Sequence, residues 1–226
     1  MQEKTTLTVD IVSDVMCPWC YVGQKRLEKA LGQVPDIDVD IRWRPFQLDP
    51  TLPPEGKDRK QYLSEKFGGD ERAGQIYSAI KEAGRQEDIP FDFEAIKVAP
   101  NTLDAHRLIR WAASAGEGVQ NRLARRLFQL YFEEGANIGD HEVLIGAARD
   151  AGMDAAIVES LLATDSDREA VQSEIATAGR MGITGVPCFL IEGKYAVMGA
   201  QDAGTLANAF RQIAGEKAGD GAPAAG

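Results

Sequence analysis

Cys17 and Cys20 are the residues of this chain best suited to chemistry, because only Pro18 and Trp19 separate them. Two thiols at this spacing can close a small disulfide ring or supply two ligands of a metal site. They precede a predicted helix, where unpaired backbone N–H groups and the positive end of the helix dipole favour a thiolate. Pro18 suits the first helical turn, since an N–H there has no intrahelical partner. The segment therefore predicts a redox site, with a metal half-site as the alternative.

The composition narrows the classes of partner. The 226 residues include 35 acidic and 25 basic ones, which gives a net charge of −10 at pH 7. There is no cluster of Lys and Arg, so we expect neither nucleic acid nor an anionic membrane surface as a partner. The first ten residues lack the apolar core of a secretory signal, and no apolar stretch is long enough to span a membrane. We therefore expect a cytoplasmic protein.

The number of cysteines bears on the choice between redox chemistry and metal binding. Three cysteines fit poorly with a framework of structural disulfides. In a reducing cytosol a Cys-x-x-Cys pair is more often catalytic or metal-binding than a static crosslink. A zinc site would need two more ligands, and the remaining candidates, Cys188, His106 and His141, show no recognised ligand spacing. We expect redox chemistry and no bound metal.

Hydrophobic periodicity predicts the elements that position the cysteines. Residues 6–13 alternate and then become continuously apolar, which is typical of a buried strand. A helix is expected over 18–31, and strict alternation over 37–43 predicts a second strand. This β-α-β order predicts two parallel strands joined by a right-handed crossover.

Prolines between Arg44 and Pro54 end this pattern, and no further strand is predicted before about residue 187. Asp140 is the expected cap of one helix in between, and Ser166 with Glu169 the expected capping box of another. The predicted helices of this region are 58–67, 70–84, 101–115, 118–134, 140–151, 153–163 and 166–181.

The chain after residue 187 is predicted to contain two strands and a final helix. Two antiparallel strands are expected at 188–191 and 195–198, followed by a helix over 202–214. With the β-α-β start, this predicts an α/β thioredoxin-like fold with a large all-helical insertion. The predicted parts are a thioredoxin-like domain from 1–50 and 165–215, an inserted helical domain over 51–164, and a Gly/Ala-rich disordered tail over 216–226.

Five segments carry recognisable motifs: SDVMCPWCYVG at 13–23, RPFQL at 44–48, NTLDAHR at 101–107, GVP at 185–187 and YAVMGAQ at 195–201. In this order they resemble the DsbA family, in particular its FrnE-like branch. The resemblance implies a thiol–disulfide oxidoreductase on a thioredoxin fold. We expect no tightly bound cofactor, with glutathione as a candidate co-substrate. The partner would be a protein or small molecule that carries a disulfide or a thiol. The sequence leaves the oligomeric state open, and a dimer is one option.

The resemblance also implies roles for individual residues. Cys17 would match the nucleophilic cysteine, Cys20 the resolving cysteine and Pro187 a cis-proline. That proline would place the Val186 backbone opposite the cysteine pair, free to bind an extended client strand. Exported members of the family carry a signal peptide, which is not evident in this sequence.

Three further residues each allow two interpretations. Trp19 would contribute an apolar ring to a client-binding platform, or pack against the inserted helices. His106 belongs to a segment that faces the redox pair in the family, so it would contact the thiolate and substrate, or else be an ordinary helix histidine. Asp14 would relay protons to the buried cysteine or, as we favour, cap the loop that enters the helix.

Cys188 directly follows the expected cis-proline, which the family pattern does not predict. It would be a third redox group or, as we favour, a small apolar residue of the core, because side chains alternate along a strand.

Two rival functions are compatible with the sequence. Kappa-class glutathione transferases and hydroxychromene-carboxylate isomerases share the fold and activate glutathione with a serine at the position that matches Cys17. The cysteine here, with a partner at Cys20, favours oxidoreduction. The other rival is a binding protein or holdase that uses the cysteines as a redox switch, and no residue demands it.

Overall fold

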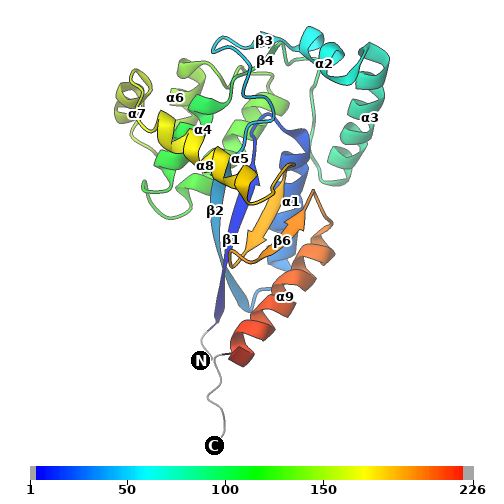
Figure 1. The fold of residues 1–226 in the computed structure, drawn as a ribbon, viewed down its shortest axis with the longest axis vertical. Coiled ribbons are helices and arrows are strands. Elements are labelled where there is room, and N and C mark those ends of the chain that lie inside the picture. The colour runs from blue at the N-terminus through cyan, green and yellow to red at the C-terminus, as the bar shows by residue number, and fades with distance from the viewer. Residues whose placement is uncertain (1–3, 221–226) are drawn as a thin grey trace, which may run out of the picture.

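The computed structural model describes residues 4–220 and is built around a four-stranded sheet (Figure 1). The strand order is β2-β1-β5-β6, with β1 parallel to β2 and the pairs β1–β5 and β5–β6 antiparallel. The strands are β1 (Thr5–Ser13), β2 (Ile37–Pro45), β5 (Cys188–Ile191) and β6 (Tyr195–Met198). The predicted thioredoxin-like order and strand directions are confirmed.

The two faces of the sheet are covered by different helices. Alternation along β1 points Leu7, Val9 and Ile11 to one face, where they join a core with α1 (Pro18–Gly32) and α9 (Ala203–Asp220). Val12 points to the other face, where it packs with Cys188 and with Ala178 of α8 (Arg168–Arg180). One face of the sheet is therefore covered by α1 and α9, whereas α8 covers only part of the other, where Asp38, Asp40 and Arg42 of β2 are exposed.

The segment between β2 and α8 is helical, as predicted, and lies at one end of the sheet. Figure 1 shows α2 and α3 on one side of this end and α4 to α7 on the other. The helices are α2 (Arg59–Phe67), α3 (Asp70–Gln86), α4 (Leu103–Ala112), α5 (Val119–Phe132), α6 (His141–Ala151) and α7 (Ala155–Leu162).

A short strand pair inside the helical segment was not predicted. Strands β3 (Lys57–Asp58) and β4 (Val98–Ala99) pair antiparallel, and the Arg59 N–H donates to the Lys97 carbonyl at 2.9 Å beside them. A two-residue strand has no measurable alternation, so periodicity cannot reveal it. The pairing closes the loop that carries α2 and α3.

The helical segment and the sheet share one continuous core. Tyr21, directly after Cys20, is fully buried and stacks on Phe128 of α5 with ring centroids 5.2 Å apart. Its ring also meets the edge of Phe91, and its hydroxyl donates to Glu133 at the end of α5. Helix α1 is thereby held against the insertion immediately after the cysteine pair.

The structure corrects two details at helix ends. Helix α9 continues to Asp220, so residues 216–220 are not part of a disordered tail; the Glu216 carboxylate accepts from the Tyr195 hydroxyl, and Lys217 Nζ donates to the Thr6 carbonyl. The rest of the predicted tail, 221–226, lies outside the described residues. The Gly/Ala-rich composition of this segment predicted disorder because the strand residues that bond to Glu216 and Lys217 are distant in the sequence.

At the other helix end, α8 begins after Asp167 rather than after Ser166, and Asp167 makes no side-chain capping bond. The Ser166–Glu169 capping box is therefore wrong, because the Ser166 hydroxyl bonds to Thr164 instead. The Asp140 cap is confirmed, since its carboxylate accepts from the Glu142 N–H. Within the described residues, no helix is both long and apolar enough to cross a membrane.

Arg107 is the largest fully buried side chain, and it holds α4 to the connection between α7 and α8. Its guanidinium donates to the carbonyls of Leu161, Thr164 and Ser166 at 2.7–2.9 Å and pairs with Asp104. Removing it would leave several buried acceptors without donors.

We expect Arg107→Met to lower the free energy of unfolding by about 3 kcal/mol, as for the loss of one partner from a buried ionic network. The matched control is Arg110→Met on the same helix, where ion pairs with Asp167 and Glu174 are exposed and worth less than about 1 kcal/mol. Urea unfolding monitored by circular dichroism measures both. Equal losses in the two variants would contradict the structural role of Arg107.

Candidate redox site

The two cysteines occupy the first turn of α1, as the sequence predicted. Cys17 is the N-cap residue with extended backbone angles, and its carbonyl accepts from the Cys20 N–H at 3.0 Å. Pro18 is the first helical residue, where it removes no intrahelical bond. Both side chains are free thiols, 5% and 2% exposed. The helical turn thus places two reduced sulfurs next to each other at the end of β1.

The loop before β5 brings Val186 against Cys17. The Cys17 sulfur lies 3.9 Å from the Val186 carbonyl oxygen, although the two residues are 169 apart in the chain. The Val186–Pro187 peptide is cis, the geometry that the family resemblance implied. Helix α1 approaches this loop at Gly23, where an added Cβ would come within 2.9 Å of the Pro187 ring. A side chain at position 23 would push the loop away from the cysteines.

Cys20 sits in a more apolar environment than a free thiol in water. Burial is the main cause that raises its pKa well above the ordinary value, and the adjacent Cys17 raises it further. The Ser13 side chain and the Asp14 backbone N–H act in the opposite direction with smaller effects. Cys20 is therefore a protonated thiol at neutral pH. It is suited to attack only after Cys17 has formed a disulfide bond with another molecule.

A cavity of about 310 Å³ opens beside Cys17. The redox wall of this cavity is formed by Cys17, Pro18, Trp19 and Val186, and the opposite wall by apolar and aromatic side chains of α2 and α3. That opposite wall includes Tyr62, Leu63, Phe67, Ile76, Tyr77 and Ile80. The inserted helices thus complete a pocket that the thioredoxin-like part alone would leave open.

The position of Trp19 is compatible with a client-binding role, and both interpretations of this residue stay predictions. Its side chain is 37% exposed, and it lines the cavity next to Cys17. It therefore forms a rim that a ligand entering the cavity would pass.

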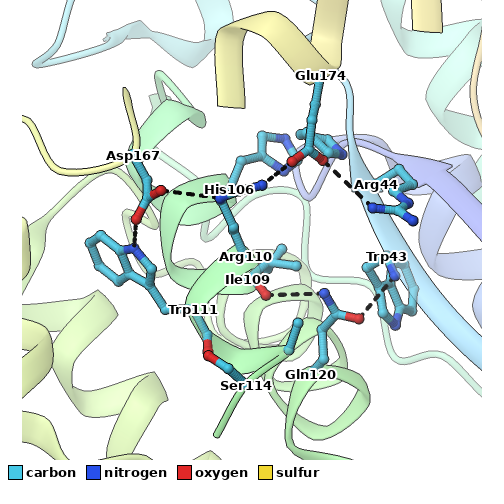
Figure 2. Close-up of a pocket in the computed structure, with 12 residues that line it drawn as sticks. Trp43, Arg44, His106, Ile109, Arg110, Trp111, Ser114, Gln120, Asp167 and Glu174 are labelled. Atoms are coloured by element: carbon cyan, nitrogen blue, oxygen red, sulfur yellow. Dashed lines mark hydrogen bonds and ion pairs between the residues drawn. The ribbon is translucent and has the colours of Figure 1, made fainter. Parts of the chain in front are cut away.

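His106 does not lie in this cavity. It lines a different pocket of about 460 Å³, shown in Figure 2 with Trp43, Arg44 and the ion pairs that Arg110 makes with Asp167 and Glu174. The ring is 3% exposed, and its Nε2 lies 3.4 Å from an Asp14 carboxylate oxygen. His106 thus contacts the loop that leads to Cys17 and is not among the residues that line the cavity, so its contact with the thiolate and substrate stays a prediction. A helical pattern predicts which face of α4 is buried, but not which neighbour that face meets.

Asp14 organises the loop that carries Cys17. The carboxylate is fully buried and accepts from the Leu48 N–H at 2.7 Å and from the Met16 N–H at 3.4 Å. The Asp14 carbonyl in turn accepts from the Cys17 N–H at 2.9 Å. These bonds agree with the loop-capping interpretation that the sequence favoured.

Cys188 lies on the opposite face of the sheet from α1. It is completely buried among Val12, Ala178 and Ile183, and burial raises its pKa. This agrees with the core interpretation, since alternation along β5 turns Cys188 away from the redox pair.

Sequence reasoning missed Arg59, Lys66 and Tyr77, which line the cavity from the inserted helices. They are ordinary helix residues by type and spacing, so no local signal separated them from surface positions. Only the packing of α2 and α3 against the redox wall identifies them. Among the described residues, no group of three or more His, Cys, Asp or Glu side chains could hold a metal ion.

Comparison with known proteins identifies the family. A family model described as a DSBA-like thioredoxin domain matches residues 8–211. The chain belongs to the DsbA-like thioredoxin family. A crystal structure of a probable DsbA oxidoreductase, SCO1869 from Streptomyces coelicolor, is 30% identical with a TM-score of 0.83, covering 93% of this chain and 91% of its own. The chain is therefore a DsbA-like oxidoreductase.

Two other relatives are more distant. YwbO of Bacillus subtilis is 29% identical over 194 residues, which are 82% of this chain and 87% of YwbO. The cytosolic disulfide reductase DsbM from Pseudomonas aeruginosa, solved with GSH, is 18% identical with a TM-score of 0.58, over 93% of this chain and 98% of its own. At this identity DsbM shows that the fold is shared.

The different environments of the three thiols in this DsbA-like protein predict unequal reactivity. We expect iodoacetamide at neutral pH to modify Cys17 at least about ten times faster than Cys20 or Cys188, because a raised pKa leaves little reactive thiolate. Peptide mass spectrometry over time measures the three rates, and full reaction in urea is the control. Comparable rates in the folded protein would contradict the proposed difference.

The bonds of Asp14 predict a stability effect. We expect Asp14→Ala to lower the free energy of unfolding by about 2 kcal/mol, because the buried Met16 N–H and the half-buried Leu48 N–H lose their acceptor. Asp38→Ala, at an exposed position of β2, is the control and should change it by less than about 0.5 kcal/mol. Thermal unfolding measures both, and an unchanged midpoint in Asp14→Ala would refute the capping role.

Proposed function

We propose that this protein catalyses thiol–disulfide exchange, with Cys17 as the attacking cysteine and Cys20 as the resolving cysteine. The observation that carries the proposal is the unequal placement of the two thiols. Cys17 lines an open cavity, whereas Cys20 is buried one turn later with a raised pKa. We assign the chain to the FrnE-like branch on the motifs of its sequence.

The exchange proceeds in two balanced steps. The Cys17 thiolate attacks one sulfur of a substrate disulfide, so that a mixed disulfide forms and the other substrate sulfur leaves as a thiolate. Cys20 then loses its proton and attacks the Cys17 sulfur, which closes the Cys17–Cys20 disulfide and releases the second substrate thiol. The substrate gains two electrons and the cysteine pair loses them. After these forward steps, an external thiol that differs from the released product restores the reduced pair by the same type of attack, and glutathione can take this part when the substrate is another disulfide. In the reverse direction, the Cys17–Cys20 disulfide takes two electrons from a substrate dithiol and is itself reduced.

Val186, Pro187 and Trp19 supply the surface on which a substrate rests. Within the described residues, neither the N–H nor the carbonyl of Val186 bonds to another backbone group. An extended peptide can therefore pair with it beside Cys17. Trp19 offers a partly exposed apolar surface at the cavity rim.

A cytoplasmic location and glutathione as co-substrate complete the proposal. They are supported by the fold shared with DsbM, which is described as a cytosolic disulfide reductase and was solved with GSH. A glutathione transferase or isomerase would need only one thiol-activating group at position 17. The buried second thiol at Cys20 favours two-electron exchange over that alternative.

The cysteine variants test the proposal. We expect Cys17→Ser to reduce disulfide turnover to the uncatalysed level and Cys20→Ser to accumulate mixed disulfides, because resolution then lacks its thiol. The control is Cys188→Ala, which should turn over at the wild-type rate because this thiol lies on the far face of the sheet. Turnover of oxidised glutathione and insulin, with mass spectrometry of trapped adducts, gives the readout. Unchanged turnover in both Cys17→Ser and Cys20→Ser would refute the proposed function.

A further inference from the structure

The cavity beside Cys17 has a charge opposite to that of the protein as a whole. The chain carries a net charge of −10, yet the only charged side chains among the described residues of the cavity wall are Arg59 and Lys66. Local positive charge in a partly enclosed apolar cavity concentrates anions there. The cavity is therefore electrostatically suited to a negatively charged ligand.

Arg59 is the more informative of the two cations. Its side chain is 9% exposed, and its guanidinium lies over the Tyr77 ring, 4.8 Å from the centroid. Its Nη1 donates to the Phe93 carbonyl at 3.1 Å, whereas the buried Nη2 makes no hydrogen bond of normal geometry. The hydroxyls of Tyr77 and Tyr131 lie close enough to the guanidinium for it to lower their pKa values against the larger effect of burial, but no acidic side chain pairs with Arg59 among the described residues. A buried guanidinium without a carboxylate is costly to the folded protein. Its missing partner is therefore expected to come from a ligand.

Lys66 has a different environment. Its ammonium group donates to the Tyr62 hydroxyl at 2.7 Å. Burial opposes the lowered pKa of Asp49, which is caused mainly by hydrogen bonds from Thr51, and the Lys66 charge contributes less; Asp49 lies outside the cavity wall. Part of its charge is thus already balanced within the protein. Arg59 remains the principal candidate for anion binding, with Lys66 as a weaker contributor at the rim.

Tyr77 connects the guanidinium to the reactive cysteine. The guanidinium lies over the Tyr77 ring, and Tyr77 and Cys17 both line the cavity. Burial is the main cause that raises the pKa of the Tyr77 hydroxyl, so this group stays a neutral hydrogen-bond donor. A ligand that pairs with Arg59 would extend over Tyr77 toward the Cys17 sulfur.

We propose that Arg59 binds a carboxylate of a low-molecular-weight disulfide and so selects small acidic peptide disulfides as substrates. A cavity of about 310 Å³ holds a group of di- or tripeptide size and excludes a folded protein. The guanidinium and a carboxylate form charge-assisted hydrogen bonds, which orient the disulfide for attack by Cys17. This inference rests on the proposed function, because the selected ligand is the substrate of the same exchange.

The first experiment compares the reduction of three disulfides by the wild-type protein, with dithiothreitol as the electron donor and the uncatalysed rate subtracted: oxidised glutathione, its fully esterified ethyl ester and cystamine. We expect kcat/KM for oxidised glutathione to exceed that for the ester by at least about tenfold, because the ester lacks the carboxylates that Arg59 binds. Cystamine, which is cationic, should react most slowly. Equal values for oxidised glutathione and its ester would overturn the proposal without the need for any variant.

The second experiment changes the cation. Arg59→Gln should raise KM for oxidised glutathione about tenfold while leaving kcat/KM for the ester within about twofold, since one charge-assisted interaction is lost. The matched control is Lys60→Gln, which removes the same charge from an exposed neighbour on α2 and should change neither substrate. Equal losses for both substrates in Arg59→Gln would show a purely structural role and overturn the proposal.

The third experiment separates ligand binding from redox turnover. In the Cys17→Ser, Cys20→Ser double variant, S-methylglutathione cannot exchange disulfides, so calorimetry reports binding alone. We expect binding that weakens about tenfold when Arg59→Gln is added. If the double variant binds but the wild-type protein turns over no disulfide, the proposed function fails while the anion site stands. Binding that is absent, or unaffected by Arg59→Gln, overturns the site.

Discussion

The antiparallel pairing of β1 with β5 is the constraint on which the site depends. The register places Val12 opposite Cys188, so the C-terminal end of β1 and the N-terminal end of β5 lie side by side. The loop after β1 and the loop before β5 therefore start at the same end of the sheet. The first loop carries Cys17 and the second carries Val186, and their approach to 3.9 Å follows from this pairing. A shift of one residue in register would turn Cys188 toward α1 and remove Val186 from the sulfur. The redox site is therefore a consequence of strand pairing rather than of the helix alone.

The inserted helices act on the same site from the other side. Tyr21 anchors the start of α1 in the aromatic core of α5, which keeps the cysteine turn in place. Helices α2 and α3 then close over Cys17, and the short β3–β4 pair ties their loop down. The insertion thus converts an exposed cysteine pair into a cavity with a defined volume. Because sheet and insertion share one core, the site and the fold have a common source of stability.

Cys17 and Cys20 differ in burial and in the charge of their surroundings, and this difference suits them to different steps of the exchange. Burial keeps Cys20 protonated, whereas Cys17 faces a cavity whose charged wall residues are cations. An anionic disulfide that binds Arg59 would bring its sulfur to Cys17, the member of the pair that lines the cavity, and leave Cys20 for resolution. In a chain with a net charge of −10, this small positive region gives the cavity an electrostatic character of its own. Substrate choice and reaction order then follow from the same arrangement.

The sequence by itself determined the cysteine pair, the four strands of the sheet and every long helix, because these depend on spacing and periodicity within short segments. It also indicated that Cys188 belongs to the core, since alternation along a strand is local. It could not locate His106, whose helix face was predictable but whose neighbour, Asp14, comes from another element.

The tertiary structure alone decided which distant residues meet at the reactive sulfur. Arg59 and Tyr77 belong to helices whose sequences resemble any amphipathic surface helix, and their position beside Cys17 arises from packing across the core. The polar anchors that extend α9 to Asp220 likewise come from strands far away in the chain. Local patterns report the period of each element, whereas a cavity is made by contacts between elements, and those are set by the free energy of packing the whole chain.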